Sequence, residues 1–315
     1  MAQKGKLKIN VEYWIARAVL GFCGALRPAR AIAIGQWFGR FGNWFPRLQK
    51  TGERNLNLAF PDLAAPERRK LLRGSFENLG RLLAIFSQFT SGDAELLKDI
   101  IDCDGLHHLA AARQAGRGVI LFTGHVGAWE LSSFALSLFG HPLSFLVRRI
   151  DNPKIEALID RARTRRGNRT IDKRSAAREM LQILNQFGTL GILVDLNTLD
   201  REAIFVDFFG RPASTTFVVA KLALRTGAQV LPVFAPWQSD HRRIRLIIDK
   251  PLAIERTGDE AEDVRRLTQA YTRVVEEYIR HYPDQWLWIH RRWKTRPKGE
   301  PPIYETLNEA LKTEN

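Results

Sequence analysis

The stretch Val119-Ile120-Leu121-Phe122-Thr123-Gly124-His125-Val126-Gly127-Ala128-Trp129-Glu130 decides the fold of this 315-residue chain. It opens with an apolar run that ends at Thr123, which is typical of a strand buried on both faces of a parallel sheet. Two glycines then lead into a helix that we expect to begin near Trp129. Open α/β sheets bind their ligands outside the carboxyl ends of the strands. We therefore expect His125 and Glu130 to lie in a site at this edge of a sheet.

Further apolar runs alternate with helical patterns along the rest of the chain. The strands that we expect cover residues 119–123, 143–147, 190–194 and 230–234, with 244–248 as an edge or antiparallel strand. The helices that we expect cover 62–89, 175–187 and 263–281, with others beginning near Trp129, at Asn152-Pro153 and at Ser214-Thr215. This alternation predicts an α/β fold with a central, mostly parallel sheet flanked by helices.

The first 50 residues carry two amphipathic helical patterns, one on each side of Pro28. Arginines interrupt both patterns, and neither reaches the roughly 20 apolar residues that a bilayer span requires. Helices with aromatic side chains on one face and arginines on the other can lie in a membrane interface. We therefore expect a membrane-associated helical segment over 1–50 and an α/β domain over 51–315. The alternative is that both helices pack on the core of that domain.

The composition points to an anionic partner, because the formal net charge is +14. Nucleic acid, an anionic membrane surface, and an acidic protein or lipid substrate all fit this charge. The two cysteines, Cys23 and Cys103, are isolated, which favours a reduced, intracellular chain. Neither lies in a metal-binding spacing.

His125 and Glu130 have the residue types of a general base and its carboxylate partner. An imidazole can take a proton from a hydroxyl, and Glu130 could accept from the other ring nitrogen and fix the tautomer. The alternative is a core histidine satisfied by a buried glutamate.

Arg148 and Arg149 follow the strand 143–147, and Asn152 precedes the next helix. Guanidinium groups suit phosphate or carboxylate recognition, so we expect these residues to bind substrate. A solvated charged surface is the alternative.

Asp195 follows the strand 190–194, and a loop with Phe209, Gly210 and Thr215 comes after it. This loop offers an apolar wall, free amides and hydroxyls, which suit an acyl chain or an oxyanion. We include Asp195 and these three loop residues among the substrate-binding candidates. An ordinary loop with a hydrophobic plug is the alternative.

A segment near the carboxyl end interleaves tryptophans with basic residues, from Gln285-Trp286-Leu287-Trp288 to Arg291-Arg292-Trp293-Lys294. Such tryptophans can stack on nucleic-acid bases or lie at a lipid headgroup layer.

Together these segments resemble the lipid A biosynthesis acyltransferases of Gram-negative bacteria (the lauroyl/myristoyl type), within the lysophospholipid acyltransferase superfamily. The resemblance runs from Arg54-Asn55-Leu56 to Lys294-Thr295-Arg296-Pro297. The histidine and the acid five residues later are shared widely, whereas the tryptophan-rich segment and Phe208-Phe209-Gly210 are more specific to this branch. One block departs from the family pattern, because Asp195-Leu196 stands where Asp-Gln is usual.

The resemblance implies acyl transfer from acyl carrier protein to a hydroxyl of an anionic lipid A precursor, as in late acylation during lipopolysaccharide biosynthesis. His125 would be the general base and Glu130 its partner, with no covalent acyl-enzyme, metal or cofactor. The resemblance also implies that the protein acts at the cytoplasmic face of the cell inner membrane. The basic surface would suit the acidic carrier protein, the lipid phosphates and the anionic leaflet.

Three alternatives remain open. The same chemistry would serve another acceptor, such as a lysophospholipid, an ornithine lipid or a glycolipid such as a phosphatidylinositol mannoside. A basic nucleic-acid-binding protein is disfavoured by the lack of a recognition helix or RNA-binding motif, so we expect no nucleic-acid partner. A structural membrane-surface protein would leave His125 and Glu130 without a role.

Overall fold

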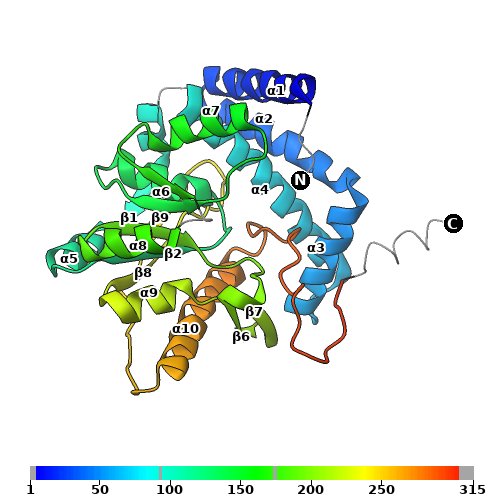
Figure 1. Cartoon of the computed structure of the whole chain (residues 1–315). Helices are drawn as coiled ribbons and strands as arrows, with labels where there is room; N and C mark the ends of the chain where they lie inside the picture. The colour runs from blue at the N-terminus through cyan, green and yellow to red at the C-terminus, as the bar shows by residue number, and fades with distance from the viewer. Residues whose placement is uncertain (1–4, 92–93, 173–175, 305–315) are drawn as a thin grey trace.

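The computed structural model describes residues 5–91, 94–172 and 176–304. A seven-stranded sheet lies at its centre, and helices cover both faces (Figure 1). The strand order is β1-β9-β8-β2-β5-β3-β4. These strands are β1 (Ile101–Asp104), β2 (Val119–Thr123), β3 (Ser144–Val147), β4 (Arg169–Asp172), β5 (Thr189–Leu193), β8 (Gln229–Phe234) and β9 (Ile244–Ile248).

The sheet is mostly parallel, as the sequence predicts. Strands β8, β2, β5, β3 and β4 run in one direction. Strand β9 is antiparallel to β8, as expected, but it is not an edge strand because β1 pairs with its other side. The strands β1 and β4 were not predicted. Each has only four residues and carries acidic or basic side chains at an edge of the sheet, so neither has an apolar run.

The two faces of the sheet bury two separate cores. Ile120 and Phe122 of β2 point into the core that also contains residues of α8, α9 and α10. Leu121, on the opposite face, packs into the core that contains residues of α4 and α6. Such alternation, with all five residues of β2 buried, explains why this strand was readable as an apolar run. The helices from α4 onward are α4 (Ala65–Ser91), α5 (Leu106–Gln114), α6 (Trp129–Leu138), α7 (Pro153–Thr164), α8 (Ala176–Asn185), α9 (Val218–Thr226) and α10 (Glu260–His281), with short 3-10 turns η2 (Ala94–Ile100) and η3 (Asp200–Glu202).

The amino-terminal helices pack directly on this body. They are α1 (Lys6–Ala25), α2 (Pro28–Gly39), the 3-10 turn η1 (Arg40–Trp44) and α3 (Pro46–Ala59). Helix α2 crosses α4 at very close range, because a Cβ at Gly35 would lie 2.3 Å from the carbonyl oxygen of Gly80. Helix α1 lies over α4 and α7, at the top of the molecule in Figure 1. The inner sides of these helices are therefore part of the fold.

The outer sides of the same helices are apolar. On α1, Trp14 and Ile15 are each 60% exposed and Phe22 is 59% exposed. Exposed aromatic side chains continue along α2, η1 and the start of α3, and they are Trp37, Phe38, Trp44 and Phe45. Within the three described ranges, no helix is both long and apolar enough to cross a membrane.

In one region the type of secondary structure differs from the prediction. We expected a loop around Phe209 and Gly210 and a helix beginning at Ser214-Thr215, but a hairpin of β6 (Ala203–Phe208) and β7 (Arg211–Thr216) occupies this region. Its turn is Phe209-Gly210, with φ values of 56° and 70°. A two-residue turn with positive φ at both positions is the favoured hairpin connection, but Asn or Asp usually stands first. Phe209 at that position hid the turn from sequence reasoning, and α9 begins only at Val218.

Candidate active site

His125 and Asp195 meet at the carboxyl ends of the neighbouring strands β2 and β5. The two strands pair in parallel up to Thr123 and Leu193, and each functional residue lies two positions beyond its strand. Nδ1 of His125 lies 2.7 Å from Oδ1 of Asp195. The backbone N–H of His125 donates to Oδ2 of the same carboxylate, also at 2.7 Å. The register of two strands therefore sets the position of the imidazole.

Asp195 is a buried, ionised carboxylate. Its side chain has no exposed surface. Burial would raise the pKa of Asp195, but the charge of His125 and hydrogen bonds from His125 and Trp286 outweigh burial and hold this pKa at about 2. The indole N–H of Trp286 donates to Oδ2 at 2.7 Å. A carboxylate held in this way keeps the proton on Nδ1, so Nε2 is the ring nitrogen that can act as a base.

Glu130 does not orient His125, in contrast to our expectation. Its two carboxylate oxygens accept from one terminal nitrogen of Arg163, at 2.9 and 3.1 Å. Glu130 lies in the first turn of α6, so it reaches toward α7, whereas Asp195 follows β5, the strand that pairs with β2 in front of His125. Glu130 and His125 nevertheless line the same cavity.

This cavity has a volume of about 720 Å³ and extends from His125 into the sheet. The pairing of β3 with β5 stops at Phe145 and Gly191, so the two strands separate toward their carboxyl ends. Residues of both separated ends line the cavity, together with α6 on one side and α8 on the other. Apart from the polar groups around His125, its wall is made largely of leucine, isoleucine and valine side chains. The cavity therefore offers an apolar channel beside the imidazole of His125.

The two arginines predicted to bind substrate have different surroundings in the structure. Arg148 lines the cavity at the end of β3. Arg149 is instead paired with Asp172 at 2.9 Å, and its side chain is 66% exposed. Asn152 caps α7, with its side-chain oxygen accepting from two backbone amides. Its amide nitrogen donates to the backbone of Ile9, which ties α1 to α7.

The other predicted substrate-binding residues have structural roles. Phe209 is buried in the core below the β6–β7 hairpin, and Gly210 forms the exposed turn. The hydroxyl of Thr215 is buried, where it accepts from the guanidinium of Arg292 at 2.5 Å. None of the three lines the cavity. Asp195 remains in the site, but as the partner of His125 and not as a cavity wall.

Asn197 and His290 line the cavity but were not among the predicted site residues. The Nε2 atom of His290 accepts from the backbone N–H of Asn197 at 3.1 Å. Burial lowers the pKa of His290 to about 4. Both residues stood inside segments that were already candidates, but their contact joins positions 93 residues apart, which no local pattern reveals.

The tryptophan-rich segment is buried and supports the loop that carries His125. Trp286, Trp288 and Trp293 are fully buried, so the interpretation that they stack on bases or lie among lipid headgroups is wrong. The backbone N–H of Leu287 donates to the carbonyl of His125 at 3.2 Å. The segment therefore holds the loop after β2 in place through a backbone hydrogen bond.

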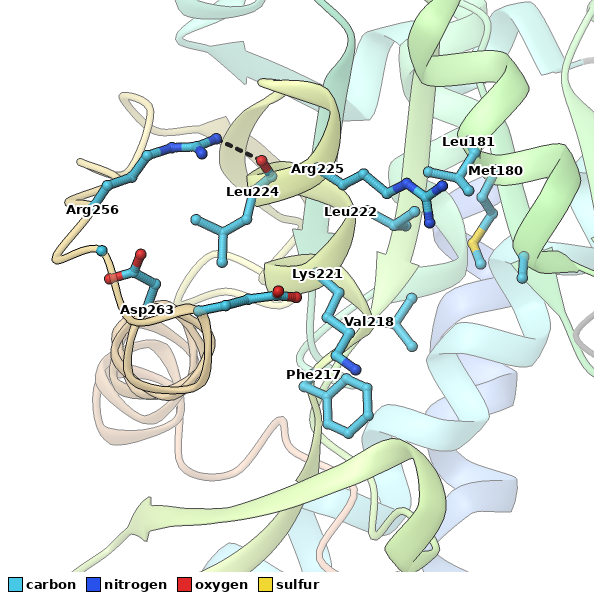
Figure 2. A pocket seen from close by; sticks show the side chains of 13 residues that line it. Met180, Leu181, Phe217, Val218, Lys221, Leu222, Leu224, Arg225, Arg256 and Asp263 are labelled. Carbon is cyan, nitrogen blue, oxygen red and sulfur yellow. Dashed lines mark hydrogen bonds between the residues drawn. The ribbon is translucent and has the colours of Figure 1, made fainter.

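A second cavity of about 690 Å³ lies between α8, α9 and the start of α10 (Figure 2). Its charged groups include Lys221 and Arg225 of α9. Arg256 donates to the carbonyl of Leu224 at 2.5 Å, and Asp263 accepts from Thr257 at 2.8 Å. No histidine is among the described residues that line it. The cavity beside His125 is therefore the candidate active site. In the described part of the chain, no cluster of three or more His, Cys, Asp or Glu side chains could hold a metal ion.

Comparison with known proteins shows the family to which the chain belongs. A family model for bacterial lipid A biosynthesis acyltransferases matches residues 2–295. The lipid A biosynthesis lauroyltransferase of Escherichia coli (strain K12) is 26% identical over 293 residues, covering 92% of this chain and 94% of the relative. The palmitoleoyltransferase of the same organism is 28% identical, with 92% and 94% covered, and the myristoyltransferase is 23% identical, with 93% and 90% covered. The resemblance found in the sequence is thereby confirmed. The chain belongs to the bacterial lipid A biosynthesis acyltransferase family and is an acyltransferase.

Proposed function

We propose that this enzyme moves a fatty acyl chain from the thioester of acyl carrier protein to a hydroxyl of a lipid A precursor, with His125 as the general base. The observation that carries the proposal is the contact of His125 with the ionised Asp195 at the mouth of a largely apolar cavity. The relatives named above act in lipid A biosynthesis and transfer acyl chains of different kinds.

In the proposed reaction, the acceptor hydroxyl gives its proton to Nε2 of His125 while its oxygen attacks the thioester carbonyl carbon. The resulting tetrahedral intermediate collapses, the carbon–sulfur bond breaks, and the departing thiolate takes the proton from His125. An ester and a free thiol result. Asp195 stabilises the imidazolium between the two steps, as a carboxylate does in a catalytic triad.

The acyl chain would occupy the channel between the separated ends of β3 and β5. Its apolar walls match a hydrocarbon chain, and burial of each methylene group is worth about 0.8 kcal/mol. Gly191 lines the cavity where the pairing of β3 with β5 ends, and a Cβ there would come 2.9 Å from Leu143 Cδ1 and 3.2 Å from Phe145 Cβ. The depth of the channel at this point would limit the chain length.

The acceptor would lie at the polar mouth of the cavity. Arg148 lines this region and can bind a phosphate of the acceptor. We propose that Glu130, held by Arg163, accepts a hydrogen bond from the acceptor and orients it. Glu130 thus stays in the site with a role different from that expected from the sequence.

The exposed apolar side of α1, α2 and η1 would rest on the cytoplasmic face of the inner membrane. Aromatic side chains such as Trp14 and Trp44, 60% and 76% exposed, are suited to the interface between headgroups and acyl chains. The net charge of +14 favours an anionic leaflet and an acidic carrier protein.

The test is a mass-spectrometric transfer assay with purified enzyme, acyl carrier protein charged with chains of several lengths, and a panel of acceptors. The proposal predicts a product whose mass equals that of the lipid A precursor plus one fatty acid minus water. Equal rates with coenzyme A thioesters would refute the carrier-protein donor. Transfer only to a lysophospholipid or an ornithine lipid would refute the acceptor and leave the chemistry intact.

A further inference from the structure

The loop after β2 has no free backbone amide at residues 125–128, although such loops often stabilise oxyanions. His125 donates its N–H to Asp195, and Val126 donates to the carbonyl of Gly124 at 2.8 Å. Gly127 donates to Gln285 at 3.0 Å, and Ala128 donates to Ala235 at 2.8 Å. Acyl transfer through a tetrahedral intermediate requires a donor aimed at the developing oxyanion. The donor therefore has to lie outside residues 125–128.

His290 lines the same cavity as His125, and its hydrogen bonding fixes its tautomer. Its Nε2 accepts from the backbone N–H of Asn197 at 3.1 Å, so Nε2 carries no proton. In the neutral ring the proton must then be on Nδ1. Over residues 5–91, 94–172 and 176–304, Nδ1 of His290 has no hydrogen-bond partner. This atom is also not fully buried, because it is absent from the set of fully buried polar atoms without a partner.

The backbone around His290 is rigidly held. Its carbonyl accepts from the side chain of Asn55 at 2.6 Å, and its N–H donates to Leu287 at 3.2 Å. Leu287 in turn donates to the carbonyl of His125. The two histidines are therefore fixed relative to one another through one short segment. Such preorganisation is what an oxyanion donor requires.

We propose that His290 is a further catalytic residue, which donates the proton of Nδ1 in a hydrogen bond to the acyl carbonyl oxygen as His125 removes the proton of the acceptor hydroxyl. The inference rests on the acyl transfer proposed above. The hydrogen bond strengthens as the carbonyl oxygen becomes negative and weakens again when the carbon–sulfur bond breaks, while the proton stays on Nδ1 throughout.

His290 remains neutral at the pH of the reaction. Burial lowers the pKa of His290 to about 4, together with the charges of Arg292, Lys294 and a protonated His125, against the opposite effect of Asp195. A neutral imidazole at this position can donate without competing with His125 for the proton in transfer. The two histidines thus have separate roles, one as base and one as hydrogen-bond donor.

The test compares two substitutions that each keep one ring nitrogen. In His290→Asn the side-chain amide can place a donor where Nδ1 stands. In His290→Gln the amide can occupy the place of Nε2 and keep the contact with Asn197. We expect kcat of His290→Asn to stay within about tenfold of wild type and kcat of His290→Gln to fall about 10²–10³-fold, as for loss of one oxyanion donor. The KM for the acyl donor should change little in either, because the contact strengthens only in the transition state. His241→Asn, outside the cavity, is the matched control.

The reverse order, with His290→Gln active and His290→Asn impaired, would overturn the inference and make His290 a positioning residue for Asn197. Equal kcat values for the two variants would overturn it as well. Should either variant fail to fold, ¹⁵N chemical shifts of the wild-type ring decide the question, because a protonated Nε2 excludes the proposed donor. An inactive wild type would instead refute the proposed acyl transfer, so the two failures are distinguishable.

Discussion

The carboxylate of Asp195 holds His125 at two points, since one oxygen lies 2.7 Å from Nδ1 and the other lies 2.7 Å from the backbone nitrogen. Both residues follow neighbouring parallel strands at equivalent positions. The orientation of the imidazole is therefore set by the sheet and not by the helix that begins at Trp129.

Replacing Asp195 by Asn should reduce kcat by roughly 10²–10⁴-fold, because the amide cannot hold the required tautomer of the base. The variant keeps the shape of the side chain, so the KM for the acyl donor should change little. Trp286→Phe removes only one hydrogen bond to the carboxylate and should cost much less, about tenfold. Steady-state kinetics of both variants check this. Wild-type kcat in Asp195→Asn would show that the carboxylate is not needed.

Stability should fall as the pH is lowered from about 6.5 to about 4, in part because of His290. Its pKa is lowered from 6.5 to about 4 in the folded protein, so the unfolded chain binds the proton first. The contribution is therefore complete above pH 6.5 and is lost as the pH approaches 4. Asp195 acts in a separate window, because its pKa is lowered from 3.8 to about 2 and its contribution disappears only below pH 3.8.

Urea unfolding of wild type and His290→Gln at several pH values isolates the contribution of His290 to stability. The difference in unfolding free energy between the two proteins should shrink by roughly 2 kcal/mol from pH 7 to pH 4. A difference that does not depend on pH would contradict the lowered pKa of His290.

Gly191→Val should shift the preferred acyl donor to chains shorter by two or more carbons. The valine would fill the channel where the pairing of β3 with β5 ends, at a stability cost of about 1–3 kcal/mol. Gly191→Ala is the matched control, because its Cβ meets first the flexible tip of Leu143, at 2.9 Å. Competition assays with mixed donor chain lengths measure the shift. An unchanged profile in a folded Gly191→Val enzyme would place the acyl chain elsewhere.

Trp14→Glu combined with Phe22→Glu should weaken binding to vesicles that contain anionic phospholipid by at least about tenfold. Both side chains are about 60% exposed on α1. Phe187→Glu is the control, because Phe187 is 63% exposed and lies two residues before β5, at the amino end of that strand. Vesicle co-sedimentation provides the comparison. Equal loss in the control and the double variant would argue against a defined membrane face.

The sequence was sufficient for the centre of the fold and for the position of His125 in the site, but not for the residue that holds His125. Strand β2 and helix α6 were predicted with their observed beginnings, because β2 is an unbroken apolar run and two glycines separate it from the helix. Asp195 was recognised as a site residue, yet its pairing with His125 depends on the register of β2 and β5. Closeness in the sequence suggested that His125 pairs with Glu130, but in the structure His125 pairs with Asp195.

The hairpin and the buried tryptophans show a second limit. Local patterns did not reveal the turn at Phe209, because the residue there is unusual for its backbone conformation. Trp286, Trp288 and Trp293 lie among arginines in the sequence, which suggested a surface. Burial of these rings depends on packing against Phe208 and Phe209, more than 75 residues earlier in the chain. Such contacts are visible only in three dimensions.

The most direct test of the account is the rate of acyl transfer from acyl carrier protein to a lipid A precursor by wild type and by His125→Ala, compared at equal folded concentration. A wild type that transfers the chain and a variant slowed by at least about 10²-fold, the usual contribution of a general base, is the predicted result. Transfer by His125→Ala at the wild-type rate would contradict it, because His125 and its bond to Asp195 would then be purely structural.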